Sequence, residues 1–176
     1  QTIEQGRFPP EKTTHYLHQM IEQVDRLEME FTNLLRTAAG AERALKLEMG
    51  DLAMDLIDVA GEFHERFGAV GIKLDVKSNV EEVLVERDPF ALKQLFRNLL
   101  DNACKYSPRG GAITLRLEKS GEQAKLRVCD QGPGIPEDEH EKIFEKFYRS
   151  RTQPTESRGG TGLGHYLSRK TARAHG

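Results

Sequence analysis

The stretch LFRNLLDNACKYS, residues 95–107, has the pattern of an amphipathic helix around which the rest of the chain can be arranged. Residues three or four apart in a helix share a face, so apolar side chains gather on one side of this stretch and polar ones on the other. One face can therefore pack while the other carries chemistry. The apolar stripe consists of Leu92, Leu95, Phe96, Leu99 and Ala103.

Three polar residues on the opposite face suggest a phosphate site. Asn98 and Asn102 lie one turn apart, so their amide oxygens point the same way, and Lys105 follows on that face. Two amide oxygens and a cation suit a phosphate held by Mg²⁺, which takes few protein ligands and shares nucleotide oxygens. Taken alone, the stretch fits an ordinary helix with a solvated polar face equally well.

Length and charge narrow the class of protein. The 176 residues suffice for one ordinary domain plus an extra element. Because 26 basic and 28 acidic residues nearly cancel, no nucleic-acid partner is expected. No apolar run approaches the roughly 18 residues needed to span a bilayer, so we expect no membrane contact by this segment. Cys104 and Cys129 fall in a predicted helix and strand, which predicts reduced, buried thiols.

The N-terminal part has the pattern of a long helix, from about Glu11 to Ala39, with Gly40 as its stop. Its apolar residues alternate spacings of three and four, which is a heptad seam and requires a helical partner. Another chain, the folded domain or a segment outside this sequence could supply that partner, and we expect some self-association. The seam consists of Leu17, Met20, Val24, Leu27, Phe31, Leu34 and Ala38.

Beyond Gly40 the hydrophobic period switches repeatedly between that of a helix and that of a strand, which predicts an α/β fold with an antiparallel hairpin. Asp51 and Asp88 are placed to cap helices. The expected elements are a strand at 44–49, a helix from Asp51 to Gly68 or Gly71, strands at 72–77 and 83–85, the organising helix after Asp88, hairpin strands at 113–118 and 124–128 with a turn at 119–122, a short helix at 137–144 and a last helix at 163–175.

Two glycine-rich stretches follow the hairpin. In DQGPGIP, residues 130–136, the glycines let a ligand approach the backbone and Asp130 could accept a hydrogen bond from an exocyclic amine. A turn with a capping aspartate is the simpler explanation of that stretch alone. Residues 149–160 lack aliphatic side chains and are predicted to form a mobile loop. The glycines at 159–164 then open the last helix, whose N-terminus suits phosphate, although the pattern is neither a P-loop nor a Rossmann fingerprint.

In this order, these stretches resemble the ATP-binding domain of sensor histidine kinases, within the group that includes gyrase, MutL and a heat-shock chaperone. NLLDNACKYS resembles the asparagine box, DQGPGIP the first glycine box, IFEKFYRS the phenylalanine box and GGTGLG the second glycine box. RLEMEFTNLLRTA resembles the second helix of the dimerisation and phosphotransfer hairpin. The implied fold is a two-layer α/β sandwich of the Bergerat type, a mixed sheet with helices on one face, preceded by the long heptad helix. The implied domains are the linker and hairpin helix at 1–42 and the catalytic domain at 43–176.

The resemblance assigns roles to the phosphate-binding residues. It implies that Asn102 ligates Mg²⁺, that Asn98 assists the metal or its water, and that Lys105 reaches a phosphate of ATP. Arg149 is implied to approach the γ-phosphate when the lid closes. The lid hinge and the phosphates are implied to be held by Gly160, Thr161, Gly162, Leu163 and Gly164.

The base would lie at the end of the hairpin. By the same resemblance, Tyr106 lies against the adenine or ribose, and Asp130 accepts the hydrogen bond of the adenine amine. Gly132 and Gly134 let the base in.

The implied function is transfer of the ATP γ-phosphoryl group to a histidine, for relay to an aspartate of a response-regulator receiver domain. The implied protein is a homodimer through the heptad helix, with this part in the cytoplasm and the parent anchored in the inner membrane. A catalytically silent nucleotide-binding scaffold, a gyrase-like ATPase and an anti-sigma-type protein-serine kinase are the alternatives. Hydrolysing relatives carry a glutamate at the place of Asn98, so the amide favours transfer.

Three departures from the family pattern qualify this interpretation. None of the six histidines fits the phosphoacceptor pattern; His64 has the right neighbour, Glu65, but lies on a predicted helix of the catalytic domain. We therefore expect a fragment without the acceptor helix and unable to phosphorylate itself. The family's closing strands, which follow the position of Gly176, are expected to be missing. His165 replaces an aliphatic residue, which either loosens the packing beneath the lid or is tolerated.

Overall fold

The chain divides into two compact units, Gln1–Glu42 and Arg43–Gly176. The computed structural model describes residues 45–151 and 160–176, together with 13, 16, 17, 20, 21, 23, 24, 27 and 31–35 of the first unit. Every described residue of the first unit has helical backbone, including the seam positions from Leu17 to Leu34. The continuous helix expected there stays a prediction, because Ala38 and most of the intervening residues lie outside the described set.

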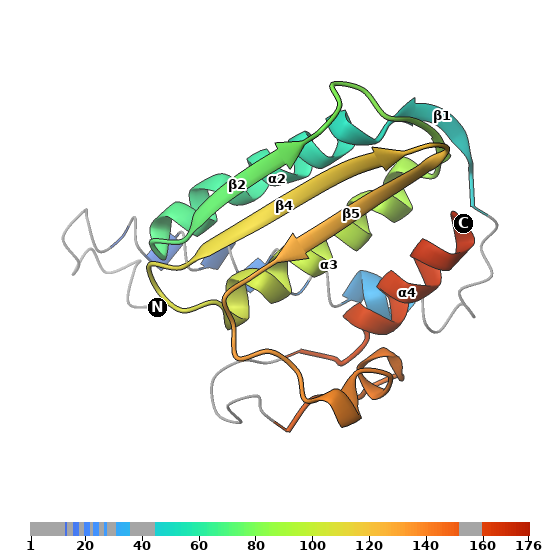
Figure 1. The fold of residues 1–176 in the computed structure, drawn as a ribbon. Helices are drawn as coiled ribbons and strands as arrows, with labels where there is room; N and C mark the ends of the chain where they lie inside the picture. Colours follow the sequence, from blue (N-terminus) through green and yellow to red (C-terminus); the bar gives the residue numbers. More distant parts are fainter. Residues whose placement is uncertain are drawn as a thin grey trace. The chain divides into compact units, whose positions relative to one another are not determined.

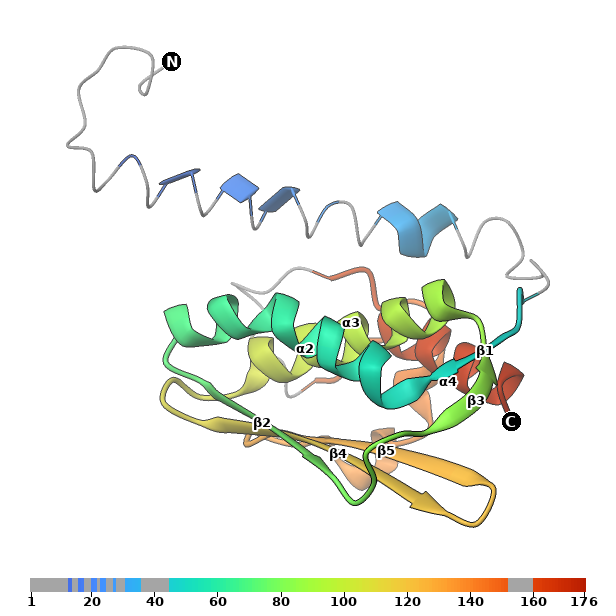
Figure 2. The same ribbon diagram turned by 90° about the horizontal axis from the view of Figure 1, so that it is seen from above.

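The second unit is an α/β fold with helices on one face of a mixed sheet, as expected (Figure 1). Strand order is β2-β4-β5, with β2 parallel to β4 and β4 antiparallel to β5; β1 and β3 form a separate antiparallel pair. Figure 2 shows α2, α3 and α4 together on one side of that sheet. The elements are β1 (Glu48–Asp51), α2 (Leu52–Ala69), β2 (Lys73–Ser78), β3 (Leu84–Arg87), α3 (Pro89–Tyr106), β4 (Ala112–Ser120), β5 (Gln123–Cys129), the 3-10 turns η1 (Glu137–Glu139) and η2 (Lys142–Phe144), and α4 (Gly164–Ala174).

Side-chain caps start the two long helices where they were predicted to start. Asp51 Oδ1 accepts hydrogen bonds from the backbone N–H of Ala53 and of Val83, each at 2.9 Å, which also ties α2 to the chain before β3. Asp88 Oδ1 accepts from the N–H of Ala91 at 2.9 Å, and Pro89 follows in the first turn, where its missing N–H costs nothing.

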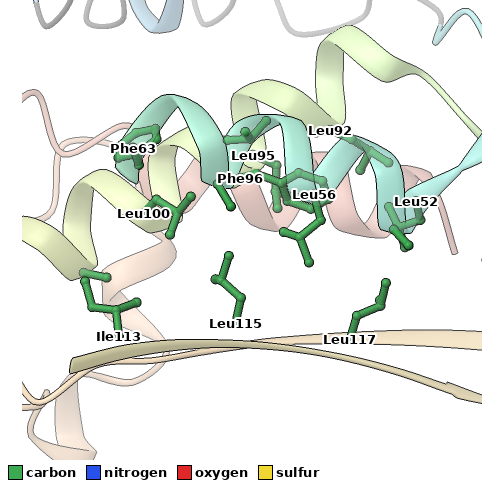
Figure 3. Close-up of a cluster of buried hydrophobic side chains, with 14 of the residues drawn as sticks. Leu52, Leu56, Phe63, Leu92, Leu95, Phe96, Leu100, Ile113, Leu115 and Leu117 are labelled. Carbon is green, nitrogen blue, oxygen red and sulfur yellow. The ribbon is translucent and has the colours of Figure 1, made fainter. Parts of the chain in front are cut away.

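The core lies between the sheet and the helices (Figure 3). Ile113, Leu115 and Leu117 alternate along β4 and point at α2 and α3, while the intervening Arg116 is exposed. Each of these three apolar residues is at most 1% exposed. Burial of such a side chain contributes roughly 1.5–3 kcal/mol, so this stripe fixes which face of the sheet the helices cover. The predicted hairpin alternation is confirmed.

Several expected details were wrong. The first strand begins at Glu48 rather than at position 44, and the hairpin turns through Gly121 and Glu122 alone. Residues 137–144 form two 3-10 turns instead of one helix, because a segment this short sustains only isolated i to i−3 hydrogen bonds. Cys129 is exposed, since it lies on the outward face of β5.

The polar face of α3 is not left to solvent. Gln94 and Asn98 are 7% and 4% exposed, because α4 packs against the side of α3 that faces away from α2. Leu100 is also buried, so apolar burial extends beyond the predicted stripe. Among the described residues, no helix is long and apolar enough to cross a membrane.

Candidate functional site

The two asparagines of α3 face the first turn of α4. A Cβ added at Gly164 would lie 3.8 Å from Asn98 Oδ1, and Nε2 of His165 lies 3.5 Å from Nδ2 of Asn102. Gly164, at the start of α4, thus lies within van der Waals reach of Asn98. The fold brings together residues that lie more than sixty positions apart in the sequence.

Lys105 extends this cluster toward the glycine-rich segment before α4. A Cβ at Gly160 would lie 3.2 Å from Nζ of Lys105, and the same ammonium lies 5.3 Å from the centre of the Tyr106 ring. Gly162 has φ +69°, a conformation that residues with a Cβ rarely adopt, and Leu163 is fully buried, which anchors the entry to the helix. Partly buried Thr161 lies between these positions.

The start of α4 adds a favourable field for anions. The helical hydrogen bonding begins with the N–H of Leu167 donating to the carbonyl of Leu163 at 2.9 Å. The N–H groups of the first turn therefore precede that ladder and point out of the helix end, where the helix dipole is positive. Together with Lys105, this end of α4 offers a phosphate both N–H donors and positive charge.

A second cluster lies at the end of β5. Asp130 Oδ1 accepts a hydrogen bond from the N–H of Gly132 at 2.7 Å. A Cβ at Gly132 would lie 2.8 Å from that oxygen and 3.1 Å from the carbonyl oxygen of Tyr106, so no other residue fits without a shift. Asp130 is exposed, so its carboxylate can accept a further hydrogen bond from a ligand. Gly134, two residues on, has φ +72°.

Neighbouring contacts hold that loop in place. Gln131 Oε1 accepts from the N–H of Ala112 at 2.9 Å, which fixes the loop to the start of β4. Lys105 and Tyr106 are consecutive residues at the end of α3. The helix therefore connects the cluster around Asn102 and Lys105 to the cluster around Asp130. Arg149 is exposed on the segment that leads to residues 152–159, and its approach to a phosphate stays a prediction.

His165 lies within the first cluster. Its ring meets that of Phe144 edge-on, with centroids 6.2 Å apart and an interplanar angle of 89°. Burial lowers the pKa of the imidazole, so His165 is neutral at pH 7. The guanidinium of Arg169 lies 4.5 Å from the centre of the Phe144 ring, which packs α4 against η2. Sequence analysis left open whether His165 loosens the packing or is tolerated. The structure favours toleration, because the His165 ring packs against Phe144.

Glu139 is a buried charged residue, beside the segment of Arg149, that sequence reasoning missed. Its side chain is 0% exposed, and Oε1 lies 3.0 Å from Nε of Arg151. Hydrogen bonds from Ser150 first, and from Arg151 next, lower the pKa of this carboxyl group. In the sequence Glu139 ends the acidic run Glu137–Glu139, which reads as a solvated surface, and no local signal marks it as buried.

Comparison with known proteins assigns this arrangement to a known group. The profile of the family described as histidine kinase-, DNA gyrase B- and HSP90-like ATPase matches residues 87–176. The adaptive-response sensory kinase SasA of Nostoc sp. PCC 7120 is 31% identical over 175 residues, which are 96% of this chain and 42% of SasA. The chain thus spans less than half the length of this curated relative.

Solved structures agree on the fold. The nucleotide-free catalytic domain of histidine kinase ThkA superposes with a TM-score of 0.66 at 29% identity, covering 74% of this chain and 82% of that domain. ThkA in complex with response regulator protein TrrA gives a TM-score of 0.64 at 27% identity, covering 83% of this chain and 43% of ThkA.

Proposed function

The chain belongs to the family of histidine kinase-, DNA gyrase B- and HSP90-like ATPases, and from that premise we propose that it is the ATP-binding catalytic part of a sensor histidine kinase. The observation that carries the proposal is the contact of Asn98 and Asn102 with the first turn of α4. Amide oxygens, a lysine and a glycine-rich helix entry gather there, which is the set of groups that a polyphosphate requires.

The donor set fits Mg²⁺ bound together with ATP. Amide oxygens are hard ligands, and a site with few protein ligands suits an ion that shares phosphate oxygens. When bound, Mg²⁺ neutralises charge on the phosphates. Asn102 would hold the ion with help from Asn98, Lys105 would bind a phosphate, and the N–H groups around Gly162 and Gly164 would cradle another. We assign Thr161 and Leu163 to the support of this cradle.

The adenine is proposed to bind at the end of β5. Asp130 would accept the hydrogen bond of the exocyclic amine, and Tyr106 would lie against the base or ribose. Gly132 supports this placement, because a Cβ at this position would contact both Asp130 and Tyr106, the two residues proposed to bind the base. Gly134 would leave the approach to the loop open.

The proposed reaction is phosphoryl transfer. The acceptor imidazole nitrogen forms a bond to the γ-phosphorus as the bond to the β,γ-bridging oxygen breaks, and ADP leaves with that electron pair. Such transfer depends mainly on positioning and charge neutralisation. The Asn98 amide cannot take a proton from water, which favours transfer over hydrolysis. Arg149 is proposed to meet the γ-phosphate when the lid closes.

The acceptor histidine is proposed to lie outside these 176 residues, on a partner helix of the heptad seam in a homodimer. His64 supports this, since it is an exposed residue of α2, within the catalytic unit itself. Relay to a receiver-domain aspartate is supported by the ThkA complex with its response regulator. We expect this chain alone, incubated with γ-labelled ATP, to accumulate no acid-labile phosphate.

Replacement of Asp130 tests the nucleotide assignment. Asp130→Asn replaces a carboxylate acceptor by an amide, and loss of a hydrogen bond to a charged group lowers affinity by about 10- to 100-fold. We expect that loss for ATP in calorimetry, whereas Asp75→Asn, on exposed β2, binds like wild type. Equal affinity of Asp130→Asn and wild type for ATP would remove Asp130 from the site.

A further inference from the structure

A buried carboxylate is bound to the residues next to Arg149. Glu139 is 0% exposed, and its Oε1 accepts hydrogen bonds from Nε of Arg151 at 3.0 Å and from the backbone N–H of the same residue at 3.5 Å. Ser150 also hydrogen-bonds to Glu139. We propose that Glu139 is a positioning residue that fixes the backbone of residues 148–151 and thereby places Arg149 for the γ-phosphate of ATP. This inference rests on the proposed function, in which Arg149 meets that phosphate.

The burial of Glu139 makes these bonds costly to break. Hydrogen bonds from Ser150 and Arg151 lower the pKa of the Glu139 carboxyl group, so the group is ionised at pH 7. A charge inside a protein requires partners, because burial removes its hydration. Movement of residues 150 and 151 away from Glu139 would leave a buried charge without these partners. The segment is therefore held in one position.

Tyr148 contacts the same carboxylate from the other side of Arg149 in the sequence. Burial first, then the charge of Glu139 and a hydrogen bond to it, raise the pKa of the Tyr148 phenol, which is therefore protonated and able to donate. The residues on both sides of Arg149 are thus bound to Glu139. The backbone of Arg149 cannot move away without breaking these bonds, whereas its side chain is exposed.

A second contact ties this segment to the proposed phosphate site. Two residues before Arg149, the backbone N–H of Phe147 donates to the carbonyl oxygen of Gly162 at 3.1 Å. Gly162 belongs to the glycine-rich entry to α4, which is proposed to cradle the phosphates. A chain spans at most about 3.6 Å per residue, so the Cα of Arg149 lies within about 7 Å of that of Phe147. The two anchors keep Arg149 close to the proposed phosphate site.

The test measures γ-phosphate discrimination, the ratio of the dissociation constants of ADP and ATP in the presence of Mg²⁺, by calorimetry on the full chain. Arg149→Ala should lower this ratio by about 10-fold or more, because a hydrogen bond between two charged groups is lost. Glu139→Gln keeps the size of the side chain and removes its charge. It should lower the ratio by about 2- to 10-fold and leave the affinity for ADP unchanged, because ADP has no γ-phosphate.

Two other variants accompany this comparison. Glu137→Gln is the matched control, because Glu137 lies in the same 3-10 turn and is exposed, and it should behave like wild type. Ser150→Ala removes a donor to Glu139 and leaves the carboxylate in place, so it should lower the ratio in the same direction. Thermal denaturation shows which variants are folded, and Ser150→Ala decides where Glu139→Gln is not.

Two further readouts separate positioning from a general loss of stability. In the Arg149→Ala background, Glu139→Gln should cause no additional loss of γ-phosphate discrimination. In nucleotide-free protein, hydrogen exchange followed by mass spectrometry should be faster in Glu139→Gln for the backbone amides of residues 148–151. Exchange in α2 and in Glu137→Gln should match that of wild type.

Three results would overturn the inference alone. These are wild-type discrimination in Glu139→Gln while Arg149→Ala loses it, a further loss when Glu139→Gln is added to Arg149→Ala, and unchanged hydrogen exchange of residues 148–151 in Glu139→Gln. If Arg149→Ala itself discriminates between ATP and ADP like wild type, the proposed role of Arg149 fails, and this inference fails with it.

Discussion

The backbone N–H of Phe147 donates a hydrogen bond of 3.1 Å to the carbonyl oxygen of Gly162, and this bond joins the chain before residues 149–160, the predicted mobile loop, to the chain after them. Both residues have positive φ, +66° at Phe147 and +69° at Gly162. A Cβ at Gly162 would lie 2.6 Å from the carbonyl carbon of Phe147. The close approach of these two backbones thus depends on a glycine at position 162.

Replacement of Gly162 by alanine should disrupt the contact between the backbones of Gly162 and Phe147. The left-handed conformation costs a residue with a Cβ about 1–2 kcal/mol, and the overlap with Phe147 adds to it. We expect a lower melting temperature in thermal denaturation and weaker ATP binding. Gly61→Ala is the matched control, because open space surrounds this exposed helix glycine and alanine there should stabilise α2 by about 0.5–1 kcal/mol. Equal effects of the two changes would contradict this role of Gly162.

Arg87 holds β1, α2 and β3 together, and its loss should destabilise the unit. Its guanidinium makes two hydrogen bonds to Asp55, of 2.7 and 3.1 Å, and one of 3.1 Å to Glu48. Arg87→Ala leaves the partly buried Asp55 carboxylate without this partner, which should cost about 2–4 kcal/mol in urea unfolding. Gly50 lacks a side chain where the guanidinium passes, so Gly50→Ala should also destabilise.

The matched control is Arg97→Ala, which removes an exposed pair with Glu62 and should cost at most about 1 kcal/mol. An Arg87→Ala variant as stable as Arg97→Ala would show that the ion pairs of Arg87 contribute nothing net.

Asp88 should make stability depend on acid pH. Burial alone would raise the pKa of its carboxyl group, but hydrogen bonds from the N–H groups of Ala91 and Lys46 outweigh burial and lower it. A lowered folded-state pKa stabilises the fold above the unfolded-state pKa, about 3.9, and this stabilisation is lost as pH falls through the folded-state value. Asp88→Asn should therefore be less stable than wild type at pH 7, by about 0.5–1 kcal/mol.

Urea unfolding at pH 7, 5 and 3.5 tests this expectation. The difference in the free energy of unfolding between Asp88→Asn and wild type should have its full value at pH 7 and pH 5 and should be smaller at pH 3.5. Asp58→Asn, on the exposed side of α2, should show no such narrowing. A difference for Asp88→Asn that is constant with pH would rule out a contribution from the carboxylate charge.

The features that sequence predicted correctly are those set by local chemistry. Asp88 caps α3 through its own neighbours, and the alternation of Ile113, Leu115 and Leu117 reports which face of β4 is buried. These patterns involve residues a few positions apart, so periodicity and capping suffice to find them. The parallel pairing of β2 with β4 was not predicted, because nothing local specifies it and the family resemblance implied only a mixed sheet.

The features that were missed depend on tertiary contacts. Asn98 is buried because α4 covers it, and Glu139 is buried because the chain returns at Ser150 and Arg151. In the sequence, Asn98 looks like part of a solvated helix face, and Glu139 looks like part of an acidic run. The sequence also does not show that Gly50 contacts Arg87 or that His165 contacts Asn102, because the residues of each pair are more than thirty positions apart.

The most direct test of the account is calorimetric titration of ATP, with and without Mg²⁺, into wild type and Asn102→Ala. We expect Mg²⁺ to raise the ATP affinity of wild type by about tenfold or more, and Asn102→Ala to lose that gain while keeping its metal-free affinity. Asn79→Ala, in the loop after β2, should retain the gain. ATP binding by folded wild type that is indifferent to Mg²⁺, or a gain that survives Asn102→Ala, would contradict the assignment of this chain as a Mg²⁺-dependent nucleotide site.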